Sequence, residues 1–503
     1  MAKNQTNKCA VCGRRGRRVC PAFAGNICPA CCGLGRGSTI ECPPECHYFP
    51  FGTEAYDLWL KVDDNWQPKA LRYVIGKVGL EAFKSSAGDF APGWLDREEA
   101  LANGSAIALN FYLSVNEEGE PPLVETWERE GWPGLSNDER VMSRYRSQSL
   151  PAVLEVQRIL NDTAVECIDR LDESRGKFIV FDRSTAGTVS RFANIVVWVT
   201  HYPHFTRLAG DGVFLANELV EPFLSLIRDR TRQEFGESTG EAVKRYLAGD
   251  FGEVYDLVES LTEERRKQLL ASVDADRCVA DYELRAPRKD IEAVLGEKPD
   301  FEMDEDYESE MGDPPGAAHY DWLRRGEAKR IEDQIPGLIR SQGEDDATVG
   351  GLGYIRVSDA GCRLTVMGRR KYEFAKELIV AYFEDKLELV NETITPIGRL
   401  MDESRRRPGS SRPEPSPAIP KDVEEQLMKK FYAQKYLQFL DEPVPMIDNL
   451  TPREAARIPS MRPKLIELIK LHLNHMDSMC AKKDFDIDID WILDELGLDE
   501  LRA

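Results

Sequence analysis

Eight cysteines close to the N-terminus have the spacing that most clearly predicts a chemistry. The chain of 503 residues contains 12 cysteines, and these eight lie between positions 9 and 46: Cys9, Cys12, Cys20, Cys28, Cys31, Cys32, Cys42 and Cys46. Cys9 with Cys12, and Cys28 with Cys31, form two C-x2-C pairs. A turn of this kind directs two thiolates at one metal ion, and Zn²⁺ prefers four ligands in a tetrahedron. The two pairs together therefore predict one complete zinc site.

The other cysteines of this segment are enough for a second site. A second Zn²⁺ would be bound by Cys20, Cys32, Cys42 and Cys46. His47 could replace Cys46 as a ligand. The ligands of the two sites would then interleave along the chain, as in cross-brace zinc modules. Because Cys31 and Cys32 are adjacent and could exchange sites, the grouping of ligands stays open.

Both sites are expected to be structural rather than catalytic. A closed four-ligand site has no open position for water or substrate. Residues 1–50 contain few apolar side chains, and bound metal can replace a hydrophobic core in so short a segment. Two Zn²⁺ per chain are therefore the expected cofactors.

The state of these thiols depends on the compartment. Residues 1–8 lack the apolar core of a signal peptide, and no run of about 18 apolar residues predicts a membrane span. We therefore expect a cytoplasmic protein that does not use a membrane as a partner. In a reducing cytoplasm, clustered thiols are typical metal ligands rather than disulfides.

The charge of the chain is distributed unevenly. With 66 Lys+Arg against 88 Asp+Glu, the formal net charge is −22, which argues against a general polyanion-binding protein. Residues 1–50 carry seven basic and two acidic residues, a formal +5, which leaves −27 for residues 51–503. A basic N-terminal segment thus precedes an acidic body.

One loop concentrates this positive charge. Between Cys12 and Cys20 stand the arginines of a single short run: Arg14, Arg15, Arg17 and Arg18. Guanidinium groups bind phosphates and carboxylates, so the loop is predicted to contact nucleic acid or an acidic protein. The alternative is a solvated loop that offsets the thiolate charge or docks on the acidic body of the same chain.

The rest of the chain predicts an α+β protein of several domains. A cross-brace-like zinc module at 1–50 is followed by a mainly helical region at 51–148 and a small antiparallel β-barrel at 149–217. A second helical region at 218–296 leads to an acidic linker at 297–316. The remainder is a helix plus a small ββαβ unit at 317–403, a Pro/Arg linker at 404–420, and a C-terminal helical docking domain at 421–503.

Local signals support several of these elements. Five short runs of strand-forming residues separated by turns predict a small antiparallel barrel or sandwich, of which we favour the barrel. Ser136 followed by Glu139, and Thr451 followed by Glu454, are the capping boxes that begin helices. Asp490 is expected to begin a last short helix that ends before Gly497.

Known catalytic motifs are missing from the sequence. It contains no phosphate-binding G-x-x-x-x-G-K-[ST] loop, no G-x-S-x-G elbow and no H-E-x-x-H helix. Only six histidines occur. The chain is therefore interpreted as a binding protein rather than an enzyme, while a hydrolase with an unidentified acidic site remains an alternative.

The motifs also resemble a known kind of protein. Cys28-Pro-Ala-Cys-Cys-Gly-Leu-Gly-Arg36 and Ile40-Glu-Cys-Pro-Pro-Glu-Cys-His-Tyr48 resemble the N-terminal cysteine-rich module of a group of uncharacterised bacterial multidomain proteins. Phe178-Ile-Val-Phe-Asp-Arg-Ser184 resembles their middle part. Tyr436-Leu-Gln-Phe-Leu-Asp-Glu-Pro-Val-Pro-Met446 with Asn449-Leu-Thr-Pro-Arg-Glu-Ala-Ala456 is similar to the toxin-binding domain of Xre/ParS-type antitoxins, which implies a protein-docking surface. A βαβ unit stands where those antitoxins carry a helix-turn-helix.

The function expected from the sequence is that of an adaptor. The zinc module and the barrel would contact a nucleic acid or ribonucleoprotein through Arg14, Arg15, Arg17 and Arg18, while the C-terminal helices bind a protein partner. A pure protein–protein scaffold is the main alternative, in which the same arginines meet an acidic protein.

Overall fold

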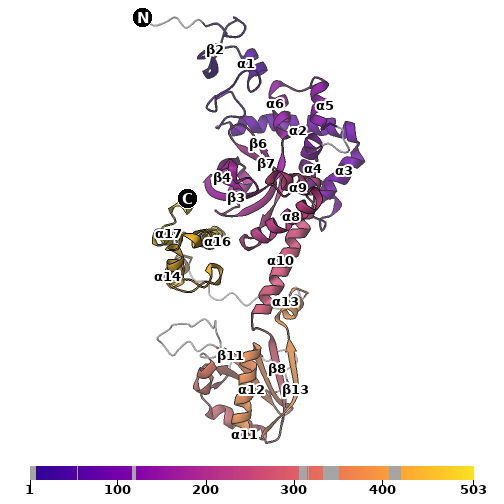
Figure 1. The fold of residues 1–503 in the computed structure, drawn as a ribbon. Coiled ribbons are helices and arrows are strands. Elements are labelled where there is room, and N and C mark those ends of the chain that lie inside the picture. Colours follow the sequence, from indigo (N-terminus) through magenta and orange to yellow (C-terminus); the bar gives the residue numbers. More distant parts are fainter. Residues whose placement is uncertain are drawn as a thin grey trace. The chain divides into compact units, whose positions relative to one another are not determined.

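The computed structural model describes residues 7–53, 55–115, 121–304, 314, 316–331, 351–406 and 421–502. The chain forms two compact units (Figure 1). The first consists of Met1–Thr262 together with Ala418–Ala503, and the second consists of Glu263–Pro417. The second unit is thus inserted into the first, and both chain ends belong to one unit. In the described ranges, no helix combines the length and the apolar character needed to cross a lipid bilayer.

The first unit begins with the cysteine module, residues 1–50, and a group of helices. The module contains β1 (Arg18–Cys20), β2 (Gly25–Ile27) and α1 (Pro29–Gly35), with β1 and β2 paired antiparallel. The helices that follow are α2 (Tyr56–Val78), α3 (Leu80–Asp89), α4 (Arg97–Ser114), α5 (Leu123–Arg129) and α6 (Asn137–Arg146). The predicted capping box of Ser136 and Glu139 is present at the start of α6.

A closed barrel of five strands follows, as the sequence predicts. Its strands are β3 (Leu150–Asn161), β4 (Ala164–Asp169), β5 (Phe178–Phe181), β6 (Asn194–His201) and β7 (Thr206–Leu215), and α7 (Arg183–Ala186) lies between β5 and β6. The prediction of a wholly antiparallel barrel is wrong, because β5 and β7 pair in parallel at Val180 and Thr206. Strand directions cannot alternate around a closed ring with an odd number of strands, so one neighbouring pair must be parallel.

Both faces of the barrel strands are buried, which explains their continuous apolar sequence. On β6, Ile195, Val197 and Val199 join a core formed mainly by barrel residues. Val196 and Trp198 join the larger core shared with the helices. Successive side chains of a strand point to opposite faces, so a strand with two covered faces is apolar at nearly every position.

The remaining helices of this part are α8 (Val220–Phe235), α9 (Gly240–Gly249) and α10 (Glu253–Ser272). The second unit contains a six-stranded sheet with the order β13-β8-β12-β11-β10-β9, in which every neighbouring pair is antiparallel. Its strands are β8 (Arg277–Leu284), β9 (Phe301–Met303), β10 (Ala318–Leu323), β11 (Gly351–Ser358), β12 (Gly361–Met367) and β13 (Leu387–Thr395). Helices α11 (Arg288–Glu297) and α12 (Arg369–Phe383) cover this sheet, and α13 (Ile397–Arg406) follows it (Figure 1).

The predicted ββαβ unit is therefore only part of a larger sheet. Strand β8 lies in the stretch 218–296, which the sequence predicts to be helical, and β9 lies in the predicted acidic linker 297–316. Residues 317–403 begin with β10, whereas the sequence predicts a helix beside the ββαβ unit. Strands β10 and β8 pair through their backbones with the two sides of the β11–β12 hairpin, and β9 pairs with β10. The edges of the hairpin are therefore not left unpaired. Residues 305–313, 332–350 and most of the predicted Pro/Arg linker lie outside the described residues.

The C-terminal helical domain, residues 421–502, closes the first unit. Its helices are α14 (Lys421–Phe439), α15 (Pro452–Ala456), α16 (Arg462–Lys483) and α17 (Trp491–Leu496). Thr451 and Glu454 make the predicted capping box of α15. Asp490 stands immediately before α17, and Gly497 ends that helix with φ of 62°, as expected from the sequence.

Candidate metal centre

The two C-x2-C pairs meet at one point in the cysteine module. The sulfur atoms of what we call the first quartet all lie within 4.8 Å of one another: Cys9, Cys12, Cys28 and Cys31. The sulfurs of Cys12 and Cys28 are 3.8 Å apart. A tetrahedron with Zn–S bonds of about 2.3 Å places its sulfurs about 3.8 Å apart. The first quartet therefore has the ligand set and the spacing of a structural zinc site, as the sequence predicts.

Local backbone geometry brings each pair into position. Gly13 follows the first pair with φ of +71°, and its N–H donates to the Cys9 carbonyl at 2.9 Å. A left-handed residue of this kind closes the turn without a Cβ penalty. In the second pair, Cys28 is the N-cap of α1, Pro29 is its first residue, and the Cys31 N–H donates to the Cys28 sulfur at 3.4 Å. The β1–β2 hairpin joins the two pairs.

Cys9, Cys28 and Cys31 of the first quartet differ in acidity. Burial by itself would raise the pKa of Cys9, but backbone N–H groups of Cys28, Cys12 and Val11 outweigh it and lower that pKa to about 6. The backbone N–H of Cys31 lowers the pKa of Cys28. Hydrogen bonding with Cys12 and Cys28 raises the pKa of Cys31 to about 12. A metal ion must displace the proton from Cys31 in order to bind. The affinity of the first quartet for a metal ion is therefore expected to fall in acid.

The other four predicted ligands, which we call the second quartet, are gathered less tightly. They are Cys20, Cys32, Cys42 and Cys46, and all but the half-buried Cys42 are buried. Burial raises the pKa of Cys42 to about 11, and the charges of Cys46, Cys32 and Cys20 act in the same direction. Within the described ranges, however, the first quartet is the one group whose ligand atoms come within 4.8 Å. A second site is thus not shown. His47, the alternative ligand, is exposed, and its ring makes an edge-to-face contact with Tyr48.

The four arginines of the loop at residues 14–18, the arginine loop, have different surroundings. Arg14, Arg15 and Arg17 are exposed, whereas Arg18 is half-buried with its guanidinium 4.4 Å from the centre of the Tyr48 ring. Side chains alternate along β1, so Arg18 lies on the same face as the buried Cys20, while Val19 between them is exposed. In the part of the chain that the structure describes, none of the four forms an ion pair with an acidic side chain.

The loop is held against the hairpin by a close backbone approach. A Cβ added to Gly16 would lie 2.6 Å from the Asn26 Cβ, which is closer than side chains tolerate. Glycine is therefore required for the loop to lie flat on β2. The exposed guanidiniums are consequently presented from a fixed surface rather than from a free tail.

An arginine that the sequence did not single out anchors the module to the helical region. The Arg36 Nε donates to Asp138 at 2.8 Å, and another of its nitrogens donates to the Tyr48 carbonyl. The Asn137 amide donates to the Arg36 carbonyl at 2.9 Å. Asp138 and Asn137 stand at the start of α6, about a hundred positions away in sequence, and no local pattern reveals that contact.

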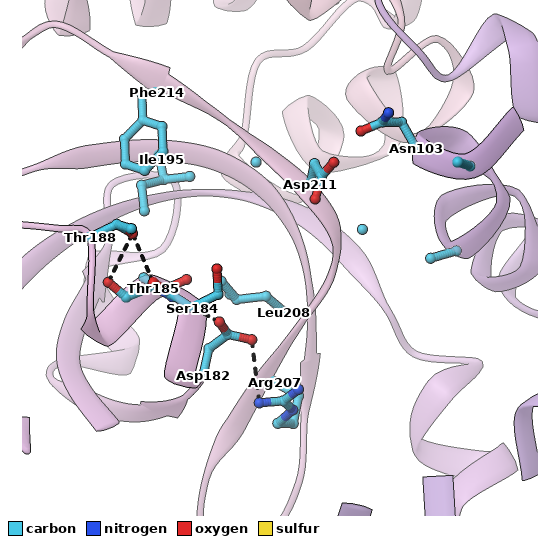
Figure 2. Close-up of a pocket in the computed structure, with 14 residues that line it drawn as sticks. Asn103, Asp182, Ser184, Thr185, Thr188, Ile195, Arg207, Leu208, Asp211 and Phe214 are labelled. Carbon is cyan, nitrogen blue, oxygen red and sulfur yellow. Dashed lines mark hydrogen bonds and ion pairs between the residues drawn. The ribbon is translucent and has the colours of Figure 1, made fainter. Parts of the chain in front are cut away.

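A polar cavity lies between α4, α7 and β7 (Figure 2). It has a volume of about 770 Å³, and two lining residues carry carboxylates, Asp182 and Asp211. Asp182 accepts from the Thr185 N–H at 2.9 Å and forms an ion pair with Arg207 at 3.4 Å. Arg207 lies 4.5 Å from the centre of the Trp59 ring. Because Asp182 caps a helix and balances a buried charge, it is better suited to a structural role than to acid–base catalysis.

Comparison with known proteins places the chain in no group. No protein-family model, no curated protein and no solved structure matches it.

Proposed function

We propose that this protein is a zinc-stabilised, non-enzymatic binding protein. Its cysteine module contacts a nucleic acid or a ribonucleoprotein, and its C-terminal helices bind a protein partner. The observation that carries the proposal is the exposure of Arg14, Arg15 and Arg17 beside the first quartet, without an acidic partner in the described ranges. The resemblance of the C-terminal segment to a toxin-binding domain supports the second half of the proposal.

Fixed guanidiniums suit phosphate binding for two reasons. Each can donate two parallel hydrogen bonds to a phosphate, and each phosphate contact releases a counterion. Phe23, at the tip of the β1–β2 hairpin, is also exposed, and an exposed ring beside arginines can stack on an unpaired base. The acidic character of residues 51–503 limits contact to this small basic surface, so we propose a single-stranded or looped nucleic acid as the ligand.

We further propose that the module holds two Zn²⁺ ions, one in each quartet. The burial of Cys20, Cys32 and Cys46 and their electrostatic influence on Cys42 support the second site. Thiolate ligands of this kind persist under reducing conditions, so we propose the cytoplasm as the compartment. Metal analysis of the purified chain tests this point, with two Zn²⁺ expected for the parent and one for Cys42→Ser. One Zn²⁺ in both proteins would contradict the second site.

Nucleic-acid binding is tested with matched arginine variants of the full chain. The loop variant replaces Arg14, Arg15 and Arg17 by alanine. The control replaces Arg72, Arg265 and Arg457 by alanine, so it has the same net charge as the loop variant. These three arginines are also exposed, and they form no ion pair in the described part of the chain. Fluorescence anisotropy with single-stranded RNA and DNA oligonucleotides is measured over a series of salt concentrations.

We expect the loop variant to bind more weakly and with a smaller salt dependence. Each phosphate contact on a single strand contributes about 0.7 to the slope of log K against log salt, so three contacts contribute about 2. The control variant should keep the slope of the parent. If the loop variant binds RNA and DNA as the parent does, the arginine loop has no role in binding nucleic acid.

A protein–protein scaffold is the second candidate, and exposed apolar residues favour it. Val19 and Leu34 are each 74 % exposed on the same module. Protein partners cover such side chains, whereas nucleic acid does not need them. A parent that binds neither RNA nor DNA, but binds an acidic peptide that the loop variant does not bind, would show that the protein acts as a protein–protein scaffold.

A further inference from the structure

The polar cavity between α4, α7 and β7 lies where the wall of the barrel is incomplete. Among the described residues, β5 pairs with β7 only at Val180 and Thr206. Strand β5 then ends at Phe181, and the chain turns into α7. Strand β7 continues to Leu215 with no second strand beside it in the described ranges, and the cavity lies along this part. Backbone N–H and C=O groups on this side of β7 can therefore hydrogen-bond to a ligand.

The walls of the cavity are held in place by packing that needs no ligand. On α7, Ala186 is buried in the barrel core, while Asp182 caps the helix and forms an ion pair with Arg207. On β7, a Cβ added to Gly210 would lie 2.7 Å from a side-chain carbon of Ile107, so α4 packs directly on the strand. The cavity is therefore preformed, as small-molecule sites in proteins usually are.

Polar side chains that lack partners line the cavity from three elements (Figure 2). The hydroxyl groups of Ser184 and Thr185 and the carboxylate of Asp211 have no hydrogen-bond or ion-pair partner among the described residues. The Asn103 amide nitrogen donates to the Glu99 carbonyl at 2.9 Å, which leaves the amide oxygen as an acceptor. Because hydroxyl groups both donate and accept, this set suits a ligand that itself carries several hydroxyl groups.

An exposed aromatic ring completes the lining. Phe214 lines the cavity from β7, and its side chain is 57 % exposed. An aromatic ring packs well on the apolar C–H face of a sugar ring, while the hydroxyl groups at the edge of the sugar reach polar side chains. The cavity thus offers both kinds of contact that a saccharide needs.

The charges of the lining argue against a phosphate-bearing ligand. The lining contains two acidic residues and one basic residue, a formal −1. Arg207 balances Asp182, which leaves the carboxylate of Asp211 uncompensated. This carboxylate can accept hydrogen bonds from hydroxyl groups, but it repels the anionic groups of nucleotides. The cavity therefore differs in chemistry from the arginine loop.

We propose that this cavity binds an uncharged oligosaccharide. One sugar ring stacks on Phe214, and its hydroxyl groups are bound by Asp211 and by the two hydroxyl side chains of α7, Ser184 and Thr185. The volume of about 770 Å³ lies within the range of small-molecule sites and leaves room for more than one sugar ring. The proposal does not depend on what the cysteine module binds.

Binding of the zinc-loaded full chain to a printed glycan array tests the class of ligand. The array carries neutral glycans together with their sulfated and sialylated derivatives. The control is Ala102→Trp, which fills the cavity from an exposed position on α4 and should leave the fold intact. We expect the parent to bind neutral glycans more strongly than their anionic derivatives, and Ala102→Trp to lose this binding. Neutral glycans bound no better by the parent than by Ala102→Trp, or anionic derivatives bound equally well, would overturn the proposal.

Calorimetric titration with the neutral glycan that binds best on the array tests the residues. Phe214→Ala should weaken binding about fivefold, because stacking on the ring is lost. Asp211→Ala should weaken binding about tenfold, because hydrogen bonds to a charged acceptor are lost. Both replaced side chains are exposed, so neither variant should unfold the chain.

Two matched variants control this titration. Phe235→Ala removes a ring that is 46 % exposed at the end of α8, outside the cavity, and Ala82→Trp adds an exposed indole on α3. Both should bind the glycan as the parent does. If Phe214→Ala and Asp211→Ala also bind it as the parent does, or if the controls lose as much affinity as they do, the glycan binds elsewhere and the proposed site is wrong.

Discussion

The cysteine module and the C-terminal helical domain are two small parts of the same unit that are stabilised in opposite ways. Four of the six fully buried residues in the core of the module are cysteines, and the other two are Ile27 and Ile40. The core of the C-terminal domain is built from many leucine, isoleucine and aromatic side chains. The difference fits a module in which a metal ion bound by the first quartet would replace apolar burial, because the chain there is too short and too polar to form a core.

Both parts are joined to the rest of the first unit by an ion pair of an arginine with one or two aspartates. Arg36 of the module donates to Asp138 of α6. Arg191, in the loop between α7 and β6, donates to Asp477 at 2.6 Å and to Asp490 at 2.9 Å in the C-terminal domain. Next to it, Phe192 has φ of 63° and inserts its ring into the core of that domain. The C-terminal attachment therefore combines ion pairs with apolar burial.

Metal removal should have the largest effect and should separate the two parts. Chelation, or the variant Cys12→Ser, removes the ion that holds the first quartet, so we expect the β1–β2 hairpin to lose its hydrogen-exchange protection entirely. The α16 helix should keep its protection, because its stability comes from apolar burial. Cys480→Ser, which alters a thiol of the C-terminal domain, is the control and should leave both metal content and hairpin protection unchanged. Intact hairpin protection in the metal-free chain would contradict the comparison.

Removal of Arg191 should affect only the C-terminal attachment. Arg191→Ala leaves Asp477 and Asp490 without their cation, and breaking such a pair costs about 3 kcal/mol, the low end of the range because the aspartates are partly exposed. The backbone amides of α16 should exchange their hydrogens faster than in the parent, while the metal content should stay the same. Arg453→Ala, which removes exposed pairs within the same domain, should cost less than about 1 kcal/mol. Equal effects of the two variants would mean that Arg191 has no special part in the attachment.

Acid should weaken the C-terminal domain through His472. Burial, with the nearby positive charges of Lys435 and His475, lowers the pKa of His472 to about 4. Between about pH 6.5 and 4 the unfolded chain binds a proton at this position and the folded chain does not. Stability is therefore lost as the pH falls through that window, by up to about 1.4 kcal/mol per pH unit from this group.

The variant His472→Gln isolates this contribution. We expect the free energy of unfolding of its C-terminal helical domain, measured with urea, to depend less on pH between 6.5 and 4 than in the parent. The same pH dependence in both proteins would show that His472 is not the responsible group.

The smallest expected effect distinguishes two arginines that the sequence grouped together. Arg18 lies over the Tyr48 ring, so Arg18→Ala should destabilise the module by about 0.5–1 kcal/mol. Arg17 is exposed, and Arg17→Ala should leave module stability unchanged. The midpoint of chelator-induced unfolding measures both. A larger loss from Arg17→Ala would contradict the assignment of Arg18 as the packing residue.

Local patterns predicted much of the structure because the responsible interactions are local. A capping box depends on residues three positions apart, as at Ser136 and Thr451, and both are present. A C-x2-C turn determines the direction of its own thiolates, so spacing predicted that the two pairs meet at one site, while the choice of Cys31 over Cys32 came from the structure. The five barrel strands could be identified because their apolar runs are bounded by turns.

Other features depend on contacts between distant segments. Cys278, Ala280 and Tyr282 alternate on the buried face of β8, a two-residue period that would have revealed a strand in the predicted helical region. No such signal marks β9, whose strand assignment depends on backbone pairing with β10. The parallel pair that closes the barrel likewise follows from strand number and order, which a single strand does not encode.

By itself, the sequence determined that residues 9–46 are rich in cysteine, that two C-x2-C pairs can share one metal, and where several helices begin. These are properties of short stretches, set by backbone geometry and thiolate chemistry. Only the tertiary structure decided that the second unit is inserted into the first, that Arg191 and Phe192 attach the C-terminal domain to the barrel, and that Arg18 packs on Tyr48 while its neighbours stay exposed. Those outcomes depend on which side chains come into contact after folding, and no local sequence pattern predicts a contact between segments that lie far apart in the chain.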